Sequence, residues 1–327
     1  MASIEDVAKK AKVSITTVSR SINNHPYVSE KTKKKIAKAM KELNYHPNSI
    51  AQQLRGQKTK MIGVIIPYIT NPFFAHLVDV IEKKALELGY HLVVLQTQSD
   101  ESLESFYLEL ISKKQLDGMI LTNLESVSPT VLQLIDDGKI VLCNRYIGDR
   151  KLPVIYIDEF QASYEGTQYL INQGHERIAF CTGHILNPND LRFKGFLAAL
   201  EEHNLEFNYL DFFDYALGIE GGRNILRKLA NKPLNRPTAI FSNGDEIAAG
   251  IISEARHFNI EIPKDMAVLG FDDQQLAAIT YPEITTIKQP IETMGVYATE
   301  YLIAQLEQKQ LPDIPKLQTD IIVRDSV

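Results

Sequence analysis

Apolar residues recur along this chain in two different patterns, and the change between them falls near residue 60. In the first sixty residues they recur every three or four positions, as on one face of a short helix. From Met61 onward, continuous apolar runs alternate with helical stretches. The first part therefore predicts a small all-helical unit, and the second part predicts an α/β body.

Three short helices are expected before residue 46. Ser3 and Asp6 form the pattern of a capping box, so the first helix begins at about residue 4. Ser14 caps a second helix that runs to about Asn23, and Ser29 caps a third. Three short helices with a tight turn between the first two are typical of a helix-turn-helix unit.

The second of these helices has an unusual surface for a solvated helix. Its sequence, "VSITTVSRSINN", carries hydroxyl side chains and a single Arg where Glu and Lys are the ordinary choice. Val18 and Ile22 fall at helical spacing and face inward. Short hydroxyl groups approach phosphates and bases closely, and Arg20 is able to make a bidentate contact to guanine. The pattern favours a helix that enters the major groove of double-stranded DNA.

Charge is divided unequally between the two parts. Residues 1–60 contain 13 Lys and Arg against 4 Asp and Glu, a net charge of +9, whereas the remainder has a net charge of −15. A small basic module on a larger acidic body is typical of a nucleic-acid-binding head. The alternative, a charged face that is merely solvated, does not account for the helix-turn-helix pattern.

The segments "IEDVAKKAKVSITTVSRSINN" and "VSEKTKKKIAKAMKELNYHPNSIAQQLR" closely resemble the DNA-binding head of the LacI/GalR (lactose and galactose repressor) family. The resemblance implies that bases are read by Ile15, Thr16 and Arg20. It also implies that phosphates are bound by Ser14, Thr17, Asn23, Ser29, Thr32, Tyr45 and Asn48. For Thr17 and Thr32, a capping or surface hydroxyl is the alternative role.

The stretch "HPNSIAQQLRGQK" predicts a short helix from Asn48 to Leu54 that is unstable alone, because isolated helices this short are marginal in water. A plain linker is the alternative. The resemblance implies a hinge helix that folds when two copies pair in the minor groove, with Ala51 and Leu54 at the DNA. Leu54 would be the wedge that enters a central base step and kinks the duplex.

The expected fold is α/β: a two-lobed, periplasmic-binding-protein-like body preceded by an all-α head and a hinge helix. Two series of strands and helices predict two lobes built on parallel sheets. "VIYID" opens the second series, and a strand is expected near 209–213. The expected domains are 1–46 (head), 47–60 (hinge and linker), 61–159 plus about 290–316 (first lobe), and 160–289 plus about 317–327 (second lobe).

Ligands of open α/β sheets bind beyond the carboxyl ends of the strands. Polar and aromatic residues follow several predicted strands, Asn144, Arg145 and Asp272 among them, although an Asp after a strand is often only a helix cap. The resemblance implies an effector pocket that is lined by Phe73, Asn144, Arg192, Asp245 and Asp272. Arg145 is compatible with two roles, binding an anionic ligand such as a sugar phosphate or uronate, or pairing with a core acid.

Other functional classes fit less well. The chain lacks GxxxxGK[ST], GxSxG and HExxH, and neither its His residues nor Cys143 and Cys181 have metal-site spacing, so no enzyme, cofactor or metal is expected. The N-terminus lacks the apolar segment of a secretory signal, and no transmembrane run exists, which indicates a cytoplasmic protein rather than a secreted binding protein. Catabolite-control relatives, which respond to a phosphorylated carrier protein, tend to carry Arg where this chain has Glu300.

We therefore expect a cytoplasmic homodimer that binds a pseudo-palindromic, double-stranded DNA operator and acts as a repressor. A small-molecule effector, a sugar or sugar phosphate, would bind between the body lobes and control operator affinity. Two copies are needed because one head contacts only a half-site and the hinge helices must pair.

Overall fold

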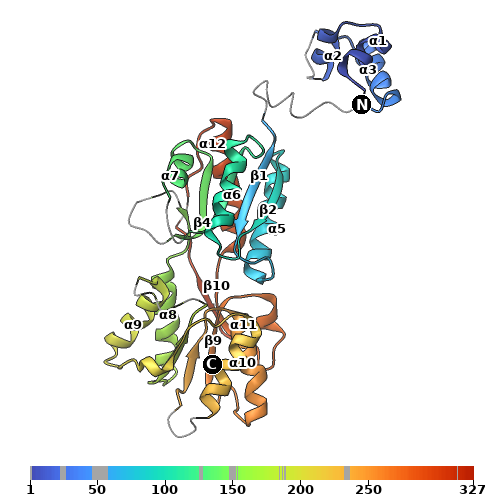
Figure 1. Ribbon diagram of the computed structural model, residues 1–327. Coiled ribbons are helices and arrows are strands. Elements are labelled where there is room, and N and C mark those ends of the chain that lie inside the picture. Colours follow the sequence, from blue (N-terminus) through green and yellow to red (C-terminus); the bar gives the residue numbers. More distant parts are fainter. Residues whose placement is uncertain are drawn as a thin grey trace. The chain divides into compact units, whose positions relative to one another are not determined.

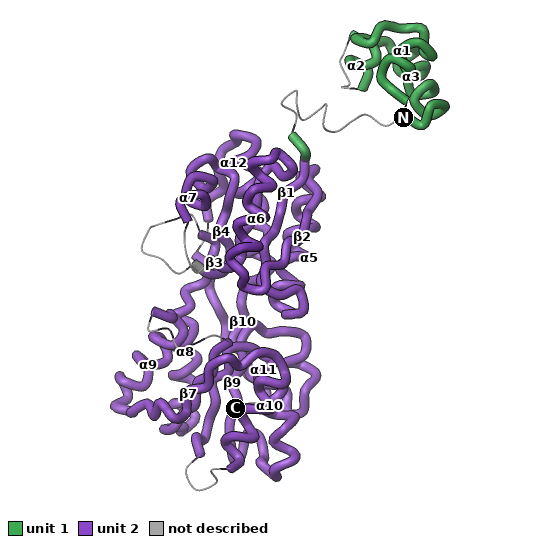
Figure 2. Tube along the Cα trace, in the orientation of Figure 1, with its two compact units in different colours: residues 1–59 green, residues 60–327 purple. Residues whose placement is uncertain are grey.

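The computed structural model describes residues 2–22, 27–45, 58–124, 128–146, 152, 154–183, 185, 187, 189–231, 236–314 and 316–327. Two compact units divide the chain, residues 1–59 and residues 60–327 (Figure 2). Among the helices of the described part, none combines the length and the apolar character that crossing a membrane requires.

The head contains the helices α1 (Ile4–Ala11), α2 (Ile15–Ile22) and α3 (Glu30–Glu42) (Figure 1). The expected capping box opens α1, since the Ser3 hydroxyl accepts from the Asp6 amide and the Asp6 carboxylate accepts from the Ser3 amide. The three helices bury one small core, which consists of Val7, Ala8, Ala11, Val18, Ile36 and Ala39. The predicted three-helix head is therefore confirmed.

The first lobe of the body is a parallel sheet in the order β2-β1-β3-β4-β5. Its strands are β1 (Met61–Ile66), β2 (His91–Gln96), β3 (Gly118–Leu124), β4 (Ile140–Tyr146) and β5 (Val154–Ile155). The helices between them are α5 (Pro72–Glu87), α6 (Glu101–Ser112) and α7 (Pro129–Asp136). β1 and β3 lie in the interior of the sheet, and residues 62–66 and 118–122 are buried because both faces of the sheet are covered.

The second lobe has a six-stranded sheet in the order β11-β10-β9-β8-β6-β7. Its strands are β6 (Ile178–Cys181), β7 (Phe212–Phe213), β8 (Ala239–Phe241), β9 (Ala267–Asp272), β10 (Thr285–Lys288) and β11 (Asp320–Ile322), with the single-turn helices η1 (Tyr209–Asp211), η2 (Arg256–Phe258) and η3 (Gln275–Ala278). The α-helices are α8 (Glu159–Asn172), α9 (Leu191–Glu202), α10 (Gly218–Ala230) and α11 (Asp245–Ala255). All its pairings are parallel except the one between β10 and β11.

Two details of the expected element order are wrong. The "VIYID" segment does not open the second series, because β5 pairs with β4 and completes the first sheet. Only residues 212–213 of the expected 209–213 strand pair with β6. Residues 209–211 form a 3-10 turn, since the Asn208 side chain accepts from the Leu210 amide and bends the chain before the strand begins.

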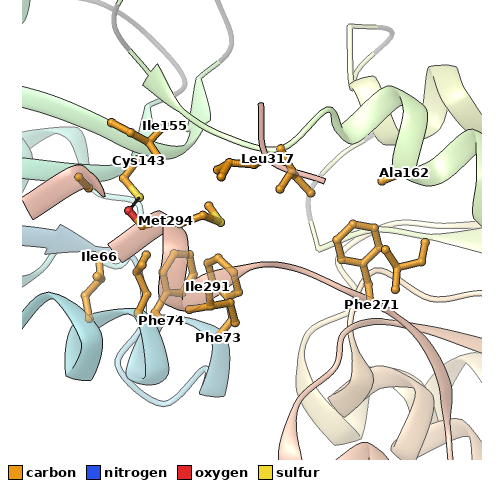
Figure 3. Packing of buried hydrophobic residues seen from close by; sticks show 14 of the residues in the cluster. Ile66, Phe73, Phe74, Cys143, Ile155, Ala162, Phe271, Ile291, Met294 and Leu317 are labelled. Atoms are coloured by element: carbon orange, nitrogen blue, oxygen red, sulfur yellow. Dashed lines mark hydrogen bonds between the residues drawn. The ribbon is translucent and has the colours of Figure 1, made fainter. Parts of the chain in front are cut away.

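The chain passes between the lobes more than once (Figure 1). After β10 of the second sheet, α12 (Ile291–Glu307) packs against α5 and β4 of the first lobe, and β11 then returns to the second sheet. Buried apolar residues of both lobes form one continuous cluster, with Phe73, Phe74 and Ile291 on one side and Phe271 on the other (Figure 3). Residues at the carboxyl ends of strands from both sheets line one cleft at this junction.

Candidate nucleic-acid interface and ligand cleft

The second helix of the head divides its residues between a core and an exposed face. Val18 is fully buried, and Ile22 packs against the same core. Thr16 and Arg20 are exposed, and so is 45% of Ile15. An exposed Ile beside hydroxyl groups and a guanidinium has no core to fill, but it can contact a thymine methyl group. The structure thus places the three predicted base-reading side chains on the accessible surface of one helix.

Two Ser–Thr pairs define the starts of α2 and α3. Ser14 Oγ lies 2.8 Å from Thr17 Oγ1 and accepts from the Thr17 amide. Ser29 Oγ lies 2.9 Å from Thr32 Oγ1 and accepts from the Thr32 amide. The serine hydroxyls are therefore the caps, and each threonine hydroxyl hydrogen-bonds to its cap, which is close to the local structural role that the sequence offered as an alternative. Contacts of these four residues with phosphate stay a prediction.

The remaining predicted DNA contacts divide into two groups. Tyr45 is partly buried and packs against the head core, so its ring has a structural role in the free protein. The other predicted contacts lie outside the described residues, as does the predicted hinge helix; they are Asn23, Asn48, Ala51 and Leu54.

The body contains a cleft of about 190 Å³ where the two sheets meet. Both lobes contribute to its lining, which consists of Pro67, Tyr68, Asn71, Phe73, Phe74, Ser99, Asn123, Asn144, Arg145, Glu159, Gly183, Arg192, Leu217, Asn243, Asp272 and Gln289. Five of the six predicted effector residues are among them. Asp245 is the exception.

Arg192 occupies the centre of a buried polar network in the second lobe. Its Nε donates to Glu159 Oε1 at 2.8 Å, and its Nη1 donates to Asn243 Oδ1 at 2.9 Å. Its guanidinium carbon lies 3.7 Å from the centre of the Phe271 ring. A guanidinium with a carboxylate, an amide and an aromatic face around it is fixed in position, because each contact restricts a different direction of movement.

Arg145 joins the two lobes. It follows the buried part of β4 in the first lobe, and its Nη2 donates to Asp190 Oδ2 at 2.6 Å at the start of α9 in the second lobe. Its Nε lies 3.7 Å from Glu159 Oε2. Of the two roles that the sequence left open, the structure therefore shows Arg145 paired with buried acids.

Asp272 ends β9 in a left-handed backbone conformation, with φ of 98°. Gln289 Nε2 donates to its Oδ1 at 2.6 Å, and Gln274 Nε2 donates to its Oδ2 at 3.3 Å. Burial raises the pKa of this carboxyl, while the charge of Arg192 acts in the opposite direction. The carboxylate thus stands at the cleft with neutral amides as its hydrogen-bonding neighbours.

The structure does not bring Asp245 to the cleft, which corrects the sequence-based assignment. Its side chain is fully buried. Its Oδ1 accepts from the Thr286 hydroxyl at 2.6 Å, and its Oδ2 accepts from the backbone N–H of Gln274 at 2.7 Å. A Cβ at position 270 would lie only 2.1 Å from Asp245 Oδ1, so Gly270 makes room for the carboxylate. Burial, together with the nearby charge of Asp272, raises the pKa of Asp245 to about 8.

Sequence reasoning missed Glu159 and Gln289 as lining residues. Both follow a strand directly or within a few residues, so the rule that selected Asn144 and Asp272 was able to find them. Asn144 itself uses its amide to donate to the Thr122 carbonyl at 3.2 Å and has φ of 85°. Only the fold shows that Glu159 reaches both guanidinium groups of the cleft.

Comparison with known proteins identifies both parts of the chain. The family described as "Bacterial regulatory proteins, lacI family" matches residues 3–48, and the "Periplasmic binding protein-like domain" matches residues 167–327. The chain is 37% identical over 329 residues to the NTD biosynthesis operon regulator NtdR of Bacillus subtilis (strain 168), covering 100% of both chains. It is 36% identical over 316 residues to the ribose operon repressor of Escherichia coli (strain K12), covering 95% of each.

Solved structures agree with this result. The LacI family transcriptional regulator from Lactobacillus casei, crystallised with bound glucose, superposes with a TM-score of 0.74 and 30% sequence identity, covering 82% of this chain and 99% of that chain. The sequence identity of 37% to NtdR and of 36% to the ribose operon repressor, over almost the whole chain, shows that this chain and those regulators belong to one family. The chain belongs to the LacI family of bacterial regulatory proteins, and it is a DNA-binding transcription regulator rather than an enzyme.

Proposed function

We propose that the protein acts in the cytoplasm as a homodimeric repressor whose operator affinity is set by a sugar-type effector bound in the cleft. The observation that carries this proposal is the cleft itself. It gathers aromatic side chains and planar polar groups from the carboxyl ends of both sheets, and a ligand held there contacts both lobes. A ligand that contacts both lobes stabilises some arrangements of the lobes more than others. Such a difference in affinity is required for a ligand to control a distant DNA-binding unit.

The head supports the other half of the proposal. Ile15, Thr16 and Arg20 would read base edges in the major groove, with Ser14, Thr17, Ser29 and Thr32 near phosphates at the starts of two helices. Two heads of one dimer would occupy the half-sites of a pseudo-palindromic operator. Leu54 of the predicted hinge would be the minor-groove wedge.

One experiment tests the effector role. An operator is first selected from random duplexes with the full-length protein, and its affinity is then measured by fluorescence anisotropy in the presence of a panel of sugars. At least one sugar should change the affinity of the wild type. Asp272→Asn should remove that change, because the carboxylate loses its charge at the cleft, while effector-free operator binding stays within about threefold of wild type. A full effector response in this variant would place the effector elsewhere.

Control by a phosphorylated carrier protein is the competing input. Glu300 of α12 pairs with Lys84 of α5 at 2.8 Å, and Glu87 lies 3.3 Å from the same ammonium group. Because acidic side chains occupy this surface, a phosphate brought by a partner protein meets like charge there. The geometry therefore supports a small-molecule effector over protein corepression.

A further inference from the structure

The cleft has two guanidinium groups, and each of them is already bound by carboxylates of the protein. Arg192 pairs with Glu159, and Arg145 pairs with Asp190 and approaches the same Glu159. All four side chains are nearly buried, with at most 14% of any one exposed. Buried charges this close interact strongly, so a ligand that competes for either guanidinium must displace a well-placed carboxylate.

Hydrogen-bond acceptors are in a different situation. The Gln289 Oε1 atom is buried and has no hydrogen-bond partner among the described residues, whereas its Nε2 donates to Asp272. Among the described residues, Asp272 accepts hydrogen bonds from the side-chain amides of Gln274 and Gln289, whereas an ionised carboxylate can accept about four. The cleft therefore offers acceptors to a ligand, which suits a molecule that donates hydroxyl hydrogens.

The balance of charge points the same way. Two Arg stand against three carboxylates, those of Glu159, Asp190 and Asp272, in this buried network. An adjoining cavity of about 70 Å³ shares Ser99 and Asn123 with the cleft, and its lining adds Asp100, Glu101 and Glu104. Because carboxylates outnumber guanidinium groups around the cleft, the net charge there is negative, and this excess disfavours an anionic ligand.

We propose that Glu159 sets the charge selectivity of the effector cleft: by occupying Arg192 and neighbouring Arg145, it restricts the cleft to polyhydroxylated ligands without an anionic group. This inference rests on the proposed effector role of the same cleft, and it rejects the sugar phosphate or uronate that the sequence left open. Glu159 acts here as a specificity-determining residue, and its effect is exerted through the two guanidinium groups.

The decisive variant is Glu159→Gln, which keeps the shape of the side chain and removes its charge. Each guanidinium keeps a second partner, since Arg192 still has Asn243 and Arg145 still has Asp190. Glu254→Gln is the matched control. Glu254 is 7% exposed and pairs with Arg227 at 2.9 Å in the same lobe, but it does not line the cleft.

Inorganic phosphate is the probe, and thermal unfolding of the full-length protein is the measurement, in phosphate and in chloride at equal ionic strength. Phosphate binding to the basic head should contribute equally to all three proteins, because positions 159 and 254 both lie in the body. We expect wild type and Glu254→Gln to show the same phosphate response. Glu159→Gln should show an additional stabilisation that corresponds to phosphate binding on the order of tenfold tighter, as one new charge-assisted contact provides. An equal phosphate response in all three proteins would overturn the proposal.

A second measurement uses wild-type protein alone, so the result does not depend on how well a variant folds. Calorimetric titrations compare ribose with ribose 5-phosphate and glucose with glucose 6-phosphate. Preference for the neutral member of a pair supports the inference, and preference for the phosphate ester overturns it while leaving a sugar-type effector in place. If no sugar binds wild type and Glu159→Gln still gains phosphate, the effector role fails and the charge selectivity of the cleft stands.

Discussion

The head and the body hold their functional groups in opposite ways. In the head, the side chains of Thr16 and Arg20 are exposed to solvent and accessible to DNA. In the body, Arg192 and Glu159 are buried and form an ion pair with each other. An exposed guanidinium is accessible to a phosphate or a base edge, and hydrogen bonds to base edges provide the selectivity. A buried, paired cation contributes selectivity because an anionic ligand binds it only by displacing its carboxylate partner. Arg thus favours the binding of DNA in the head and disfavours the binding of anionic ligands in the body.

Salt provides the largest test of this difference. If each head neutralises roughly four to five phosphates, operator binding by the dimer should show a slope of log K against log[salt] of about −7 to −9. Effector binding in the buried cleft should change little over the same range, because buried pairs are screened weakly. Anisotropy and calorimetry over a salt series measure the two quantities. A flat response of operator binding would remove the electrostatic account of the head.

Removing the central guanidinium should have the next largest effect. Arg192→Ala leaves Glu159 buried without its closest cation, which typically costs about 3–5 kcal/mol in the free energy of unfolding. Chemical denaturation of the DNA-free protein measures it. The Glu159→Gln variant should lose less, because the Gln side-chain oxygen can still accept from Arg192, which also keeps its hydrogen bond to Asn243. Equal losses in the two variants would show that packing, rather than charge, determines the stability of this site.

In the head, Arg20→Ala should cost about 1–3 kcal/mol of operator binding per half-site and relax the preference at one base position. Thr17→Ala should weaken binding to all DNA sequences similarly. It should also destabilise the start of α2, because the Thr17 hydroxyl is hydrogen-bonded to the capping Ser14. Selection from random duplexes with each variant distinguishes the two patterns. A uniform loss with unchanged base preference in Arg20→Ala would mean that another face of α2 reads the DNA.

The raised pKa of Asp245 predicts a pH effect in the body. Because the folded pKa of about 8 exceeds the ordinary value of 3.8, the folded state binds more protons than the unfolded state between these values. The free energy of unfolding therefore falls as pH rises from about 4 to 8, by about 1.4 kcal/mol per pH unit where the difference is one full proton. Denaturation at pH 6 and 7 should show this fall in wild type relative to Asp245→Asn. If the free energy of unfolding changed with pH in the same way in wild type and Asp245→Asn, the raised pKa of Asp245 would be contradicted.

The smallest effect is expected at a surface ion pair of the head. Lys33 lies 2.8 Å from Glu30 on α3, and most of the Glu30 side chain is exposed. Lys33→Ala should change the free energy of unfolding by less than about 1 kcal/mol, because exposed pairs gain little over their hydrated charges. Chemical denaturation of Lys33→Ala and Arg192→Ala in parallel compares the two changes in the free energy of unfolding. A loss in Lys33→Ala as large as that in Arg192→Ala would show that solvent exposure does not determine how much an ion pair contributes to stability.

Most elements were predictable because they depend on local pattern. Ser3, Ser14 and Ser29 begin their helices as capping chemistry requires, and the apolar runs became strands within a few residues. Two-residue strands were the difficult case: β5 and β7 are too short for a pattern to say which sheet they join.

The cleft was predictable only in part. Position after a strand selected Arg145 and Asp272 correctly, but it does not give the direction in which a side chain points. Asp245 follows its strand as the rule requires, yet it turns toward the space above Gly270 and away from the cleft. The pairing of Arg192 with Glu159 joins residues 33 positions apart, and no local pattern contains it.

The link between Arg145 and Asp190 also has a consequence for the speed of signalling. Because this ion pair connects the lobes, separating them to admit or release a ligand requires that it break first. We expect ligand association slower than collision, since the open arrangement has to form before binding, and correspondingly long occupancy once the lobes have closed. The duration of a transcriptional response would then depend on the lifetime of the ion pairs that Arg145 makes across the lobes, and Asp190→Asn would shorten that response.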